Sequence, residues 1–256
     1  MISLKRDFKR RIEMQERFSN HYSRFNIIDA IDMAQQLEVN IDSTFQIKTD
    51  YKSKKPLTLG EKCCAISHLN ALQKLVNSDE DYCIVIEDDL IGGDLDFDNL
   101  SLLVSEILKQ SDESITILGG QQGLKNSKYL SGYRLSRNLW EIPKISQDFI
   151  TRACCYLITK KAAIKVINYQ SNKLVRSDQW KELCNGQIKL YYSDLFRHPT
   201  NLSNSRLERD RKLNSIISRV LSDGIVKLLN RNIIKIYIRL LQYSLMIENV
   251  TIKSNK

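Results

Sequence analysis

The sequence contains little proline and glycine, with 3 Pro and 9 Gly among 256 residues. This scarcity argues against long disordered linkers, which are usually rich in such residues. No apolar stretch reaches the roughly 18 uninterrupted residues that indicate a membrane span. The chain also lacks the G-x-x-x-x-G-K-[ST] motif, which excludes nucleotide chemistry of the P-loop type. Residues 1–6 show no apolar signal segment, so we expect a cytoplasmic protein.

Zinc-binding and redox patterns of cysteine are absent as well. The six cysteines form two adjacent pairs and two single residues, with no C-x-x-C spacing. They are predicted to be reduced packing residues, which is typical of the cytoplasm. They are Cys63, Cys64, Cys83, Cys154, Cys155 and Cys184.

Positive charge is concentrated near the C-terminus. Of 39 basic and 30 acidic residues, 28 basic and 26 acidic lie in residues 1–204, a net charge of +2. Residues 205–256 hold 11 basic and 4 acidic residues, a net charge of +7. We therefore divide the chain into a domain at 1–204 and a basic tail at 205–256, whose charge indicates a partner of its own.

Apolar runs and helical periodicities alternate along the first 170 residues. Strands are expected near 1–4, 25–30, 82–86, 115–120 and 154–158, and helices near 7–18, 58–76, 98–109 and 160–168. Thr58 and Glu61 have the spacing of a capping box at the start of the second helix. Residues 40–56 are polar and irregular, as in a loop. Strands that alternate with helices predict an α/β layered sheet.

Three consecutive carboxylates, Glu87, Asp88 and Asp89, follow the apolar run at 82–86. Neighbouring carboxylates oppose one another's ionisation, so the triplet favours a compensating cation. Oxygen ligands suit Mg²⁺ or Mn²⁺, with a phosphate-bearing substrate completing the coordination. Ligands also bind at the carboxyl ends of strands in open α/β sheets. A solvated acidic loop is the alternative interpretation of the triplet alone.

Several motifs occur in one order along the chain: Ile2-Ser3-Leu4 with Arg10-Arg11, Asp29-Ala30, Leu57 to Glu61, Cys64 to His68, Glu87-Asp88-Asp89, and Ala153 to Ala163. In this combination the chain resembles glycosyltransferase family 25, the bacterial lipooligosaccharide glycosyltransferases related to collagen galactosyltransferases. The resemblance covers about residues 1–200. Each motif alone is weak, whereas the helix segment followed by the acidic triplet is specific.

The resemblance implies a GT-A-like single domain, with a mixed central sheet flanked by helices and followed here by an amphipathic helical tail. It also implies transfer of a hexose, with galactose favoured, from a UDP-sugar donor to a lipid-linked oligosaccharide with inversion. Mn²⁺ or Mg²⁺ is expected at the triplet. Such a protein would act on the inner face of the bacterial inner membrane.

The chemistry of this transfer assigns roles to particular residues. The leaving diphosphate needs a cation, for which we name Glu87, Asp89 and His198. Asp88 is expected to contact the donor or metal-bound water. Six further donor-site residues are predicted: the strand-end group Ser3, Leu4 and Arg6, together with Arg10, Arg11 and Asp29. His68 is expected at the donor site or behind it.

Inversion requires a base that takes the proton of the acceptor hydroxyl. Asp178, acidic and next to Trp180, is the first choice, and Asp148 is its competitor. Both also fit ordinary helix caps.

In the tail, residues 213–246 have helical apolar spacing, interrupted near 223–224. Lys227, Arg231, Lys235 and Arg239 recur every four residues and line one face. Such a helix either lies on an anionic membrane or packs on the catalytic domain with a solvated basic stripe. Nucleic acid is not expected as a partner, because no aromatic platform accompanies the stripe.

Two other functions compete with the transferase. A non-catalytic scaffold could keep this fold and recruit partners through the basic tail. A nucleotidyl- or phosphotransferase could use the same acids to bind metal.

Overall fold

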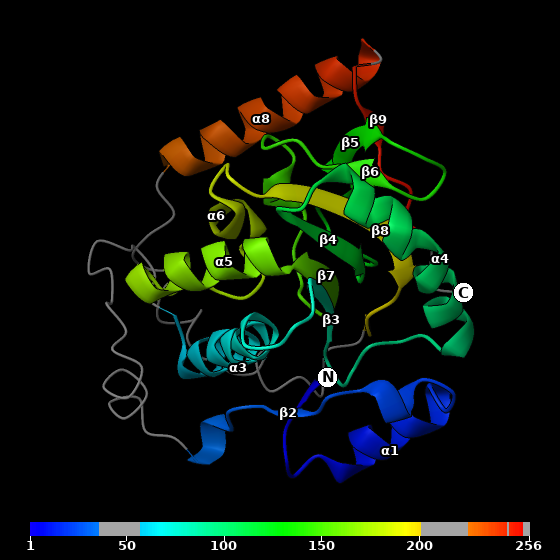
Figure 1. The fold of residues 1–256 in the computed structure, drawn as a ribbon. Helices are drawn as coiled ribbons and strands as arrows, with labels where there is room; N and C mark the ends of the chain where they lie inside the picture. The colour runs from blue at the N-terminus through cyan, green and yellow to red at the C-terminus, as the bar shows by residue number, and fades with distance from the viewer. Residues whose placement is uncertain (36–56, 201–224, 245, 253–256) are drawn as a thin grey trace.

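The computed structural model describes residues 1–35, 57–200, 225–244 and 246–252. In these residues a mixed sheet of seven strands forms the centre of the molecule (Figure 1). In spatial order its strands are β3 (Tyr82–Ile86), β7 (Cys155–Thr159), β4 (Ser114–Gly119), β8 (Lys189–Phe196), β6 (Trp140–Glu141), β5 (Ser131–Arg134) and β9 (Glu248–Asn249). The α/β class and the mixed sheet are thus confirmed.

The strand directions determine which loops meet at each end of the sheet. β4 and β8 pair in parallel, and β7 is antiparallel to both β3 and β4. Hence β3, β4 and β8 run in one direction, and their carboxyl ends lie along the same edge. This edge is where α/β sheets bind ligands.

Two short strands form a separate small sheet beside the end of β3. β1 (Ile2–Ser3) pairs in parallel with β2 (Ile28–Asp29), and a parallel bridge joins Ile2 to Glu87. The carboxyl ends of β1 and β2 therefore lie at the same edge as that of β3. This arrangement brings the N-terminal strands beside the acidic triplet.

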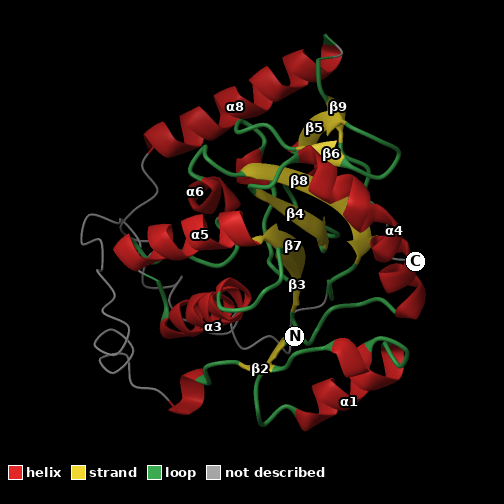
Figure 2. Ribbon diagram, viewed as in Figure 1, coloured by secondary structure: helices red, strands yellow, loops and turns green. Residues whose placement is uncertain are grey.

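Helices cover both faces of the sheet (Figure 2). α3 (Leu59–Val76), α5 (Lys160–Asn172) and α6 (Trp180–Cys184) lie on one side. α4 (Asp94–Gln110) lies on the other, and α1 (Phe8–Arg17) lies by the N-terminal strands. Short 3₁₀ helices occur at Tyr22–Arg24, Met33–Gln35, Ser127–Tyr129 and Gln147–Phe149. Each face has its own hydrophobic core, with apolar side chains of β7 alternating between the two.

The predicted capping box fixes the start of α3. The Glu61 backbone N–H donates to Thr58 Oγ1 over 3.2 Å, and the Thr58 N–H donates to Glu61 Oε2 over 3.1 Å. Both bonds satisfy amides that the first helical turn leaves unpaired. α4 begins four residues before its predicted start, because the Asp96 carboxylate accepts from the Gly93 N–H over 2.9 Å and closes the first turn.

The carboxyl end of β4 depends on two glycines. Gly119 has φ 129° and Gly120 has φ 76°, backbone conformations that favour glycine. A Cβ on Gly119 would lie 2.0 Å from the Phe196 carbonyl oxygen, and one on Gly120 would lie 2.4 Å from Cys154 Sγ. The glycines therefore allow the ends of β4, β7 and β8 to pack closely.

The described part of the tail packs on the sheet domain. α8 (Ile225–Tyr243) buries Ile238 fully, and β9 pairs with β5. Ile247 and Val250 belong to the same core as Ile238. The predicted boundary at 204/205 and the predicted loop at 40–56 fall outside the described residues. Among the helices that are described, none combines the length and the apolar character needed to cross a membrane.

Two basic residues of α8 contact an aromatic ring of the sheet domain. Lys235 Nζ lies 5.1 Å from the centre of the Tyr129 ring, and the Arg239 guanidinium lies 5.6 Å from it. These cation–π contacts tie Lys235 and Arg239 to the sheet domain, although Arg239 stays exposed to solvent. Apolar side chains of the helix are also exposed, namely Ile233, Ile236, Tyr237, Leu240 and Tyr243.

Candidate active site

The acidic triplet lies where the segments after β3 and β8 meet. The backbones of Ile91 and Arg197 exchange two hydrogen bonds of 2.9 Å each. This bridge brings the residue after Arg197, His198, close to the triplet. His198 Nε2 lies 3.7 Å from Asp89 Oδ2. Residues that are far apart in sequence thus converge at the carboxyl edge of the sheet.

Glu87, Asp89 and His198, the three predicted metal ligands, lie close together. One ligand atom from each lies within 4.8 Å of the other two. His198 Nδ1 is 2.9 Å from the Pro199 carbonyl oxygen, which can only accept, so Nδ1 carries a proton. In the neutral imidazole, the lone pair on Nε2 then faces the carboxylates. A divalent cation between them would turn this repulsion into coordination.

The ionised carboxylate of Asp89 is destabilised by its surroundings. Burial, together with the neighbouring Glu87 carboxylate, raises the pKa of Asp89 to about 6 from 3.8. Its Oδ1 is buried and has no hydrogen-bond partner in the described part of the chain. A buried carboxylate oxygen without a donor costs free energy, which a bound cation would recover. The residues therefore fit a hard divalent ion.

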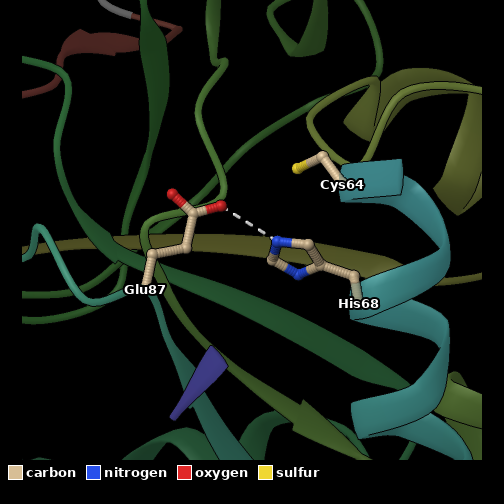
Figure 3. Close-up of side chains that lie close together, drawn as sticks. All are labelled: Cys64, His68 and Glu87. Carbon is tan, nitrogen blue, oxygen red and sulfur yellow. Dashed lines mark hydrogen bonds and ion pairs between the residues drawn. The ribbon is translucent and has the colours of Figure 1, made fainter. Parts of the chain in front are cut away.

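Glu87 is fixed by a chain of buried hydrogen bonds. His68 Nε2 lies 3.0 Å from Glu87 Oε1, and His68 Nδ1 lies 3.0 Å from the Tyr156 hydroxyl (Figure 3). Burial opposes the charged forms of both partners. Tyr156, Cys64 and Glu87 nonetheless raise the pKa of His68 well above its ordinary value of 6.5. Burial alone would raise the pKa of Glu87, but the bond from His68 and the positive charges around the carboxylate together lower it, so the carboxylate stays ionised.

Asp88 has a different partner. Arg10 Nη1 donates to Asp88 Oδ1 over 2.8 Å and lies 3.8 Å from Asp89 Oδ2. The guanidinium therefore neutralises part of the charge of the triplet. With 38% of its side chain exposed at the pocket wall, Arg10 is also placed to meet an anionic ligand.

A pocket of about 580 Å³ opens beside the triplet. This volume is within the usual range for small-molecule sites. Three predicted donor-site residues from the end of β1, Ser3, Leu4 and Arg6, line it, as do Arg10, His68 and the whole triplet. Further walls come from Ile31 to Met33 and from the first three turns of α3. The acids thus form one side of a cavity large enough for a nucleotide sugar to enter.

Two predicted donor residues serve another purpose in this structure. Arg11 donates to Ser3 Oγ and the Ser3 carbonyl, each over 3.1 Å, and to Asp29 Oδ1 over 2.7 Å. Arg11 and Asp29 therefore join the ends of β1 and β2 and are not among the residues that line the pocket. Arg6 lines the pocket but is held by Asp32 at 2.7 Å.

The two predicted bases lie in different surroundings. Asp148 forms an ion pair with Lys181 at 2.5 Å. Asp178 Oδ1 lies 3.6 Å from Arg176 Nε but makes no hydrogen bond with a described residue. The residue before it, Ser177, places its hydroxyl 3.3 Å from Cys64 Sγ. Asp178 is thus close to α3, although neither aspartate lines the pocket.

Cys64 and Tyr156 were not among the predicted site residues. Cys64 is one helical turn before His68, and both side chains project from α3 toward Glu87 (Figure 3). The i, i+4 spacing was visible in the sequence, since such residues share a helix face. Cys64 and its neighbour Cys63 both line the pocket, but only Cys64 lies within 4.8 Å of ligand atoms of His68 and Glu87. Tyr156 lies in the quoted motif from Ala153 to Ala163, but its partner His68 is 88 residues away in the sequence and meets it only through the packing of β7 on α3.

Comparison with known proteins identifies the family of this chain. The profile of "Glycosyltransferase family 25 (LPS biosynthesis protein)" matches residues 1–180. A stretch of 94 residues is 32% identical to the "Lipooligosaccharide biosynthesis protein lic2B" of Haemophilus influenzae. That match covers 37% of this chain and only 34% of the relative. Because the family profile spans most of the chain and includes α3 and the acidic triplet, this protein belongs to glycosyltransferase family 25.

Proposed function

We propose that this protein is a metal-dependent glycosyltransferase that moves a hexose, with galactose as the first choice, from a UDP-sugar to a lipooligosaccharide acceptor with inversion. The observation that carries the proposal is the cluster of Glu87, Asp89 and His198 at the wall of the pocket. Family membership supports glycosyl transfer, and the name of the Haemophilus influenzae relative supports a lipooligosaccharide acceptor. A GT-A-like fold is part of the proposal.

The cluster would hold Mn²⁺ or Mg²⁺, which supplies charge neutralisation for the departing diphosphate. His68 keeps Glu87 ionised and oriented, through a bond that Tyr156 supports from behind. Arg10 restrains Asp88 and adds positive charge at the pocket wall. Ser3, Leu4 and Arg6 at the end of β1 are the proposed contacts of the nucleotide.

The acceptor hydroxyl needs a base, and we assign Asp178 in preference to Asp148. Asp178 has one buried oxygen that accepts no hydrogen bond from a described residue, and it follows Ser177, which touches Cys64 at the pocket. Both aspartates have a basic neighbour, but Lys181 lies 2.5 Å from Asp148 whereas Arg176 lies 3.6 Å from Asp178. The less tightly paired carboxylate is the better acceptor for the proton that inversion releases.

The exposed apolar face of α8 supports a peripheral position on the inner face of the inner membrane. Between Ile225 and Tyr243 the helix contains four basic residues and no acidic residue. Helices with an apolar face and basic flanks bind the interface of anionic membranes. The apolar residues, rather than the basic stripe, would enter the lipid.

A panel of nucleotide sugars tests the proposal. Release of UDP is followed with Mn²⁺ and with EDTA, in wild type and in Asp89→Asn, with Asp79→Asn on the exposed turn before β3 as the control. Metal-dependent release from one UDP-hexose, lost only in Asp89→Asn, is the expected result. Turnover of nucleoside triphosphates instead would indicate the nucleotidyl- or phosphotransferase. Absence of both turnover and donor binding in folded protein, with an acceptor glycan present, would indicate a scaffold.

A further inference from the structure

A second set of metal-binding atoms lies beside the acidic cluster. Cys64 Sγ, a ring nitrogen of His68 and a carboxylate oxygen of Glu87 all lie within 4.8 Å of one another. Two come from one face of α3 and the third follows β3 (Figure 3). We propose that these three side chains form a thiophilic cation site, which takes Zn²⁺ or a similar ion and shares Glu87 with the cluster of Asp89 and His198.

The donor atoms select the type of ion. Thiolate and imidazole favour Zn²⁺, Co²⁺ and Cd²⁺, whereas Mg²⁺ and Mn²⁺ prefer oxygen. The cluster of Glu87, Asp89 and His198 offers two carboxylates and one imidazole and has no sulfur. The two clusters therefore differ in ligand chemistry although they share one residue.

The distances suit a small ion after minor adjustment. Zinc bonds of about 2.0–2.3 Å at tetrahedral angles place ligand atoms roughly 3.4–3.6 Å apart. His68 Nε2 and Glu87 Oε1 are now 3.0 Å apart, and the other separations are at most 4.8 Å. Side-chain movements of about an ångström would bring all three atoms to bonding distance of one centre.

The surroundings of His68 match those of a metal ligand. Ligating histidines usually hold their second ring nitrogen in a hydrogen bond, which orients the ring. The Tyr156 hydroxyl fills this role at His68 Nδ1 and leaves Nε2 toward Glu87. The Tyr156 and His68 rings are also stacked, with 5.7 Å between their centres.

The site is open to ions from solvent. Cys64, His68 and Glu87 all line the pocket of about 580 Å³, so a fourth ligand position faces the cavity. Three protein ligands with one open position are typical of accessible zinc sites. Binding would release to solvent the thiol proton of Cys64 and the proton that His68 Nε2 donates to Glu87.

Sharing of Glu87 has a consequence for Mn²⁺. An ion bound to Cys64, His68 and Glu87 takes one ligand from the hard cluster and adds positive charge a few ångströms from it. Zn²⁺ and Mn²⁺ are therefore expected to compete, even though only one of them contacts sulfur. This competition rests on the three side chains and holds whether or not the protein transfers a sugar.

Co²⁺ provides the test, because a bound thiolate gives a sulfur-to-cobalt charge-transfer absorption in the near ultraviolet. The reduced full-length protein is titrated with Co²⁺ without oxygen, as wild type, Cys64→Ser and Cys63→Ser. Cys63 is the matched control, since it is the adjacent buried thiol of α3 but is not part of the cluster. Circular dichroism checks that each variant is folded.

Wild type and Cys63→Ser are expected to show the absorption, and Cys64→Ser is expected to lose it. Added Zn²⁺ should abolish the absorption of wild type and of Cys63→Ser. Zn²⁺ should also weaken Mn²⁺ binding to wild type by at least tenfold. Lack of the absorption in wild type, or its persistence in Cys64→Ser, would overturn the assignment. Loss in both folded serine variants would do the same, since it would show that the signal does not depend on Cys64 alone.

Discussion

His198 Nε2 lies 3.7 Å from Asp89 Oδ2, although His198 follows β8 and Asp89 follows β3. Two strands, β7 and β4, separate β3 from β8 in the sheet. The residues meet because both strands end at the same edge and the backbones of Ile91 and Arg197 pair beyond them. The imidazole is thus delivered to the acidic triplet by the topology of the sheet.

The raised pKa of Asp89 predicts a pH-dependent stability. Because the folded pKa is about 6 and the ordinary value is 3.8, the folded state binds this proton more tightly than the unfolded state. Ionised Asp89 therefore costs folding free energy above pH 6, on the order of 3 kcal/mol, and the cost vanishes below about pH 3.8. Asp89→Asn should raise the Tm of protein in EDTA at pH 8, by less at pH 5.

Thermal unfolding between pH 8 and pH 4 measures this effect, with Asp79→Asn as the control at an exposed position. A gain that does not depend on pH, or a lower Tm of Asp89→Asn at pH 8, would show that the carboxylate is not destabilised by its surroundings.

Tyr156→Phe removes the hydroxyl behind His68 and keeps the ring, which packs edge-on to Trp180 with 5.1 Å between ring centres. Loss of such an outer hydrogen bond typically weakens metal affinity or activity by about 10–100-fold. We expect a loss of this size in Mn²⁺ affinity and in kcat, with a fall in unfolding free energy of about 1 kcal/mol. Tyr133→Phe, at an exposed position of β5, is the control. Equal Mn²⁺ affinity in the two variants would contradict the role of Tyr156.

The neighbouring arginines should respond differently to substitution. Arg10→Gln releases Asp88 and removes positive charge from the pocket, so the KM for the donor should rise by about tenfold. Arg11→Gln breaks the hydrogen bonds to Ser3 and Asp29. Its main effect should be a fall of about 1 kcal/mol in unfolding free energy, seen as a lower Tm. Donor kinetics and thermal melts of both variants provide the comparison, and an increase in KM confined to Arg11→Gln would reverse the assignment.

The exposed face of α8 predicts a defined effect on membrane binding. Leu240→Glu puts a charge on the apolar face and should weaken binding to vesicles with anionic lipids by at least tenfold. Leu102→Glu on α4 is the control, because Leu102 is also exposed but lies on another element. Vesicle sedimentation measures both variants. Equal loss of vesicle binding in Leu240→Glu and Leu102→Glu, or no binding by wild type, would contradict a membrane role for the apolar face of α8.

Local sequence patterns predicted the elements that carry the triplet. The apolar run at 82–86 became β3, and the capping box at Thr58 became the start of α3. These features depend on residues close together in the chain. They therefore placed Glu87, Asp88 and Asp89 at a strand end and His68 within a helix.

Long-range packing decided the rest. No strand was predicted at Lys189–Phe196, yet β8 is central to the sheet and positions His198. Basic residues at every fourth position predicted a helix in the tail. Its contacts with Tyr129, which is more than 100 residues away in the sequence, had no such signal. Arg11 and Asp29 were predicted as donor contacts, but the pairing of β1 with β2 brings them to each other. Such contacts have no signal in local spacing.

Mn²⁺ binding, followed by the electron paramagnetic resonance of the unbound ion with and without UDP, tests the central claim most directly. Wild type should bind one Mn²⁺ that UDP tightens, and Asp89→Asn and His198→Gln should each weaken binding by at least tenfold. His21→Gln, which alters a histidine paired with Asp98 at the surface, should bind as wild type does. Equal Mn²⁺ affinity in wild type, Asp89→Asn and His198→Gln would contradict the metal site and the metal-dependent transfer proposed from it.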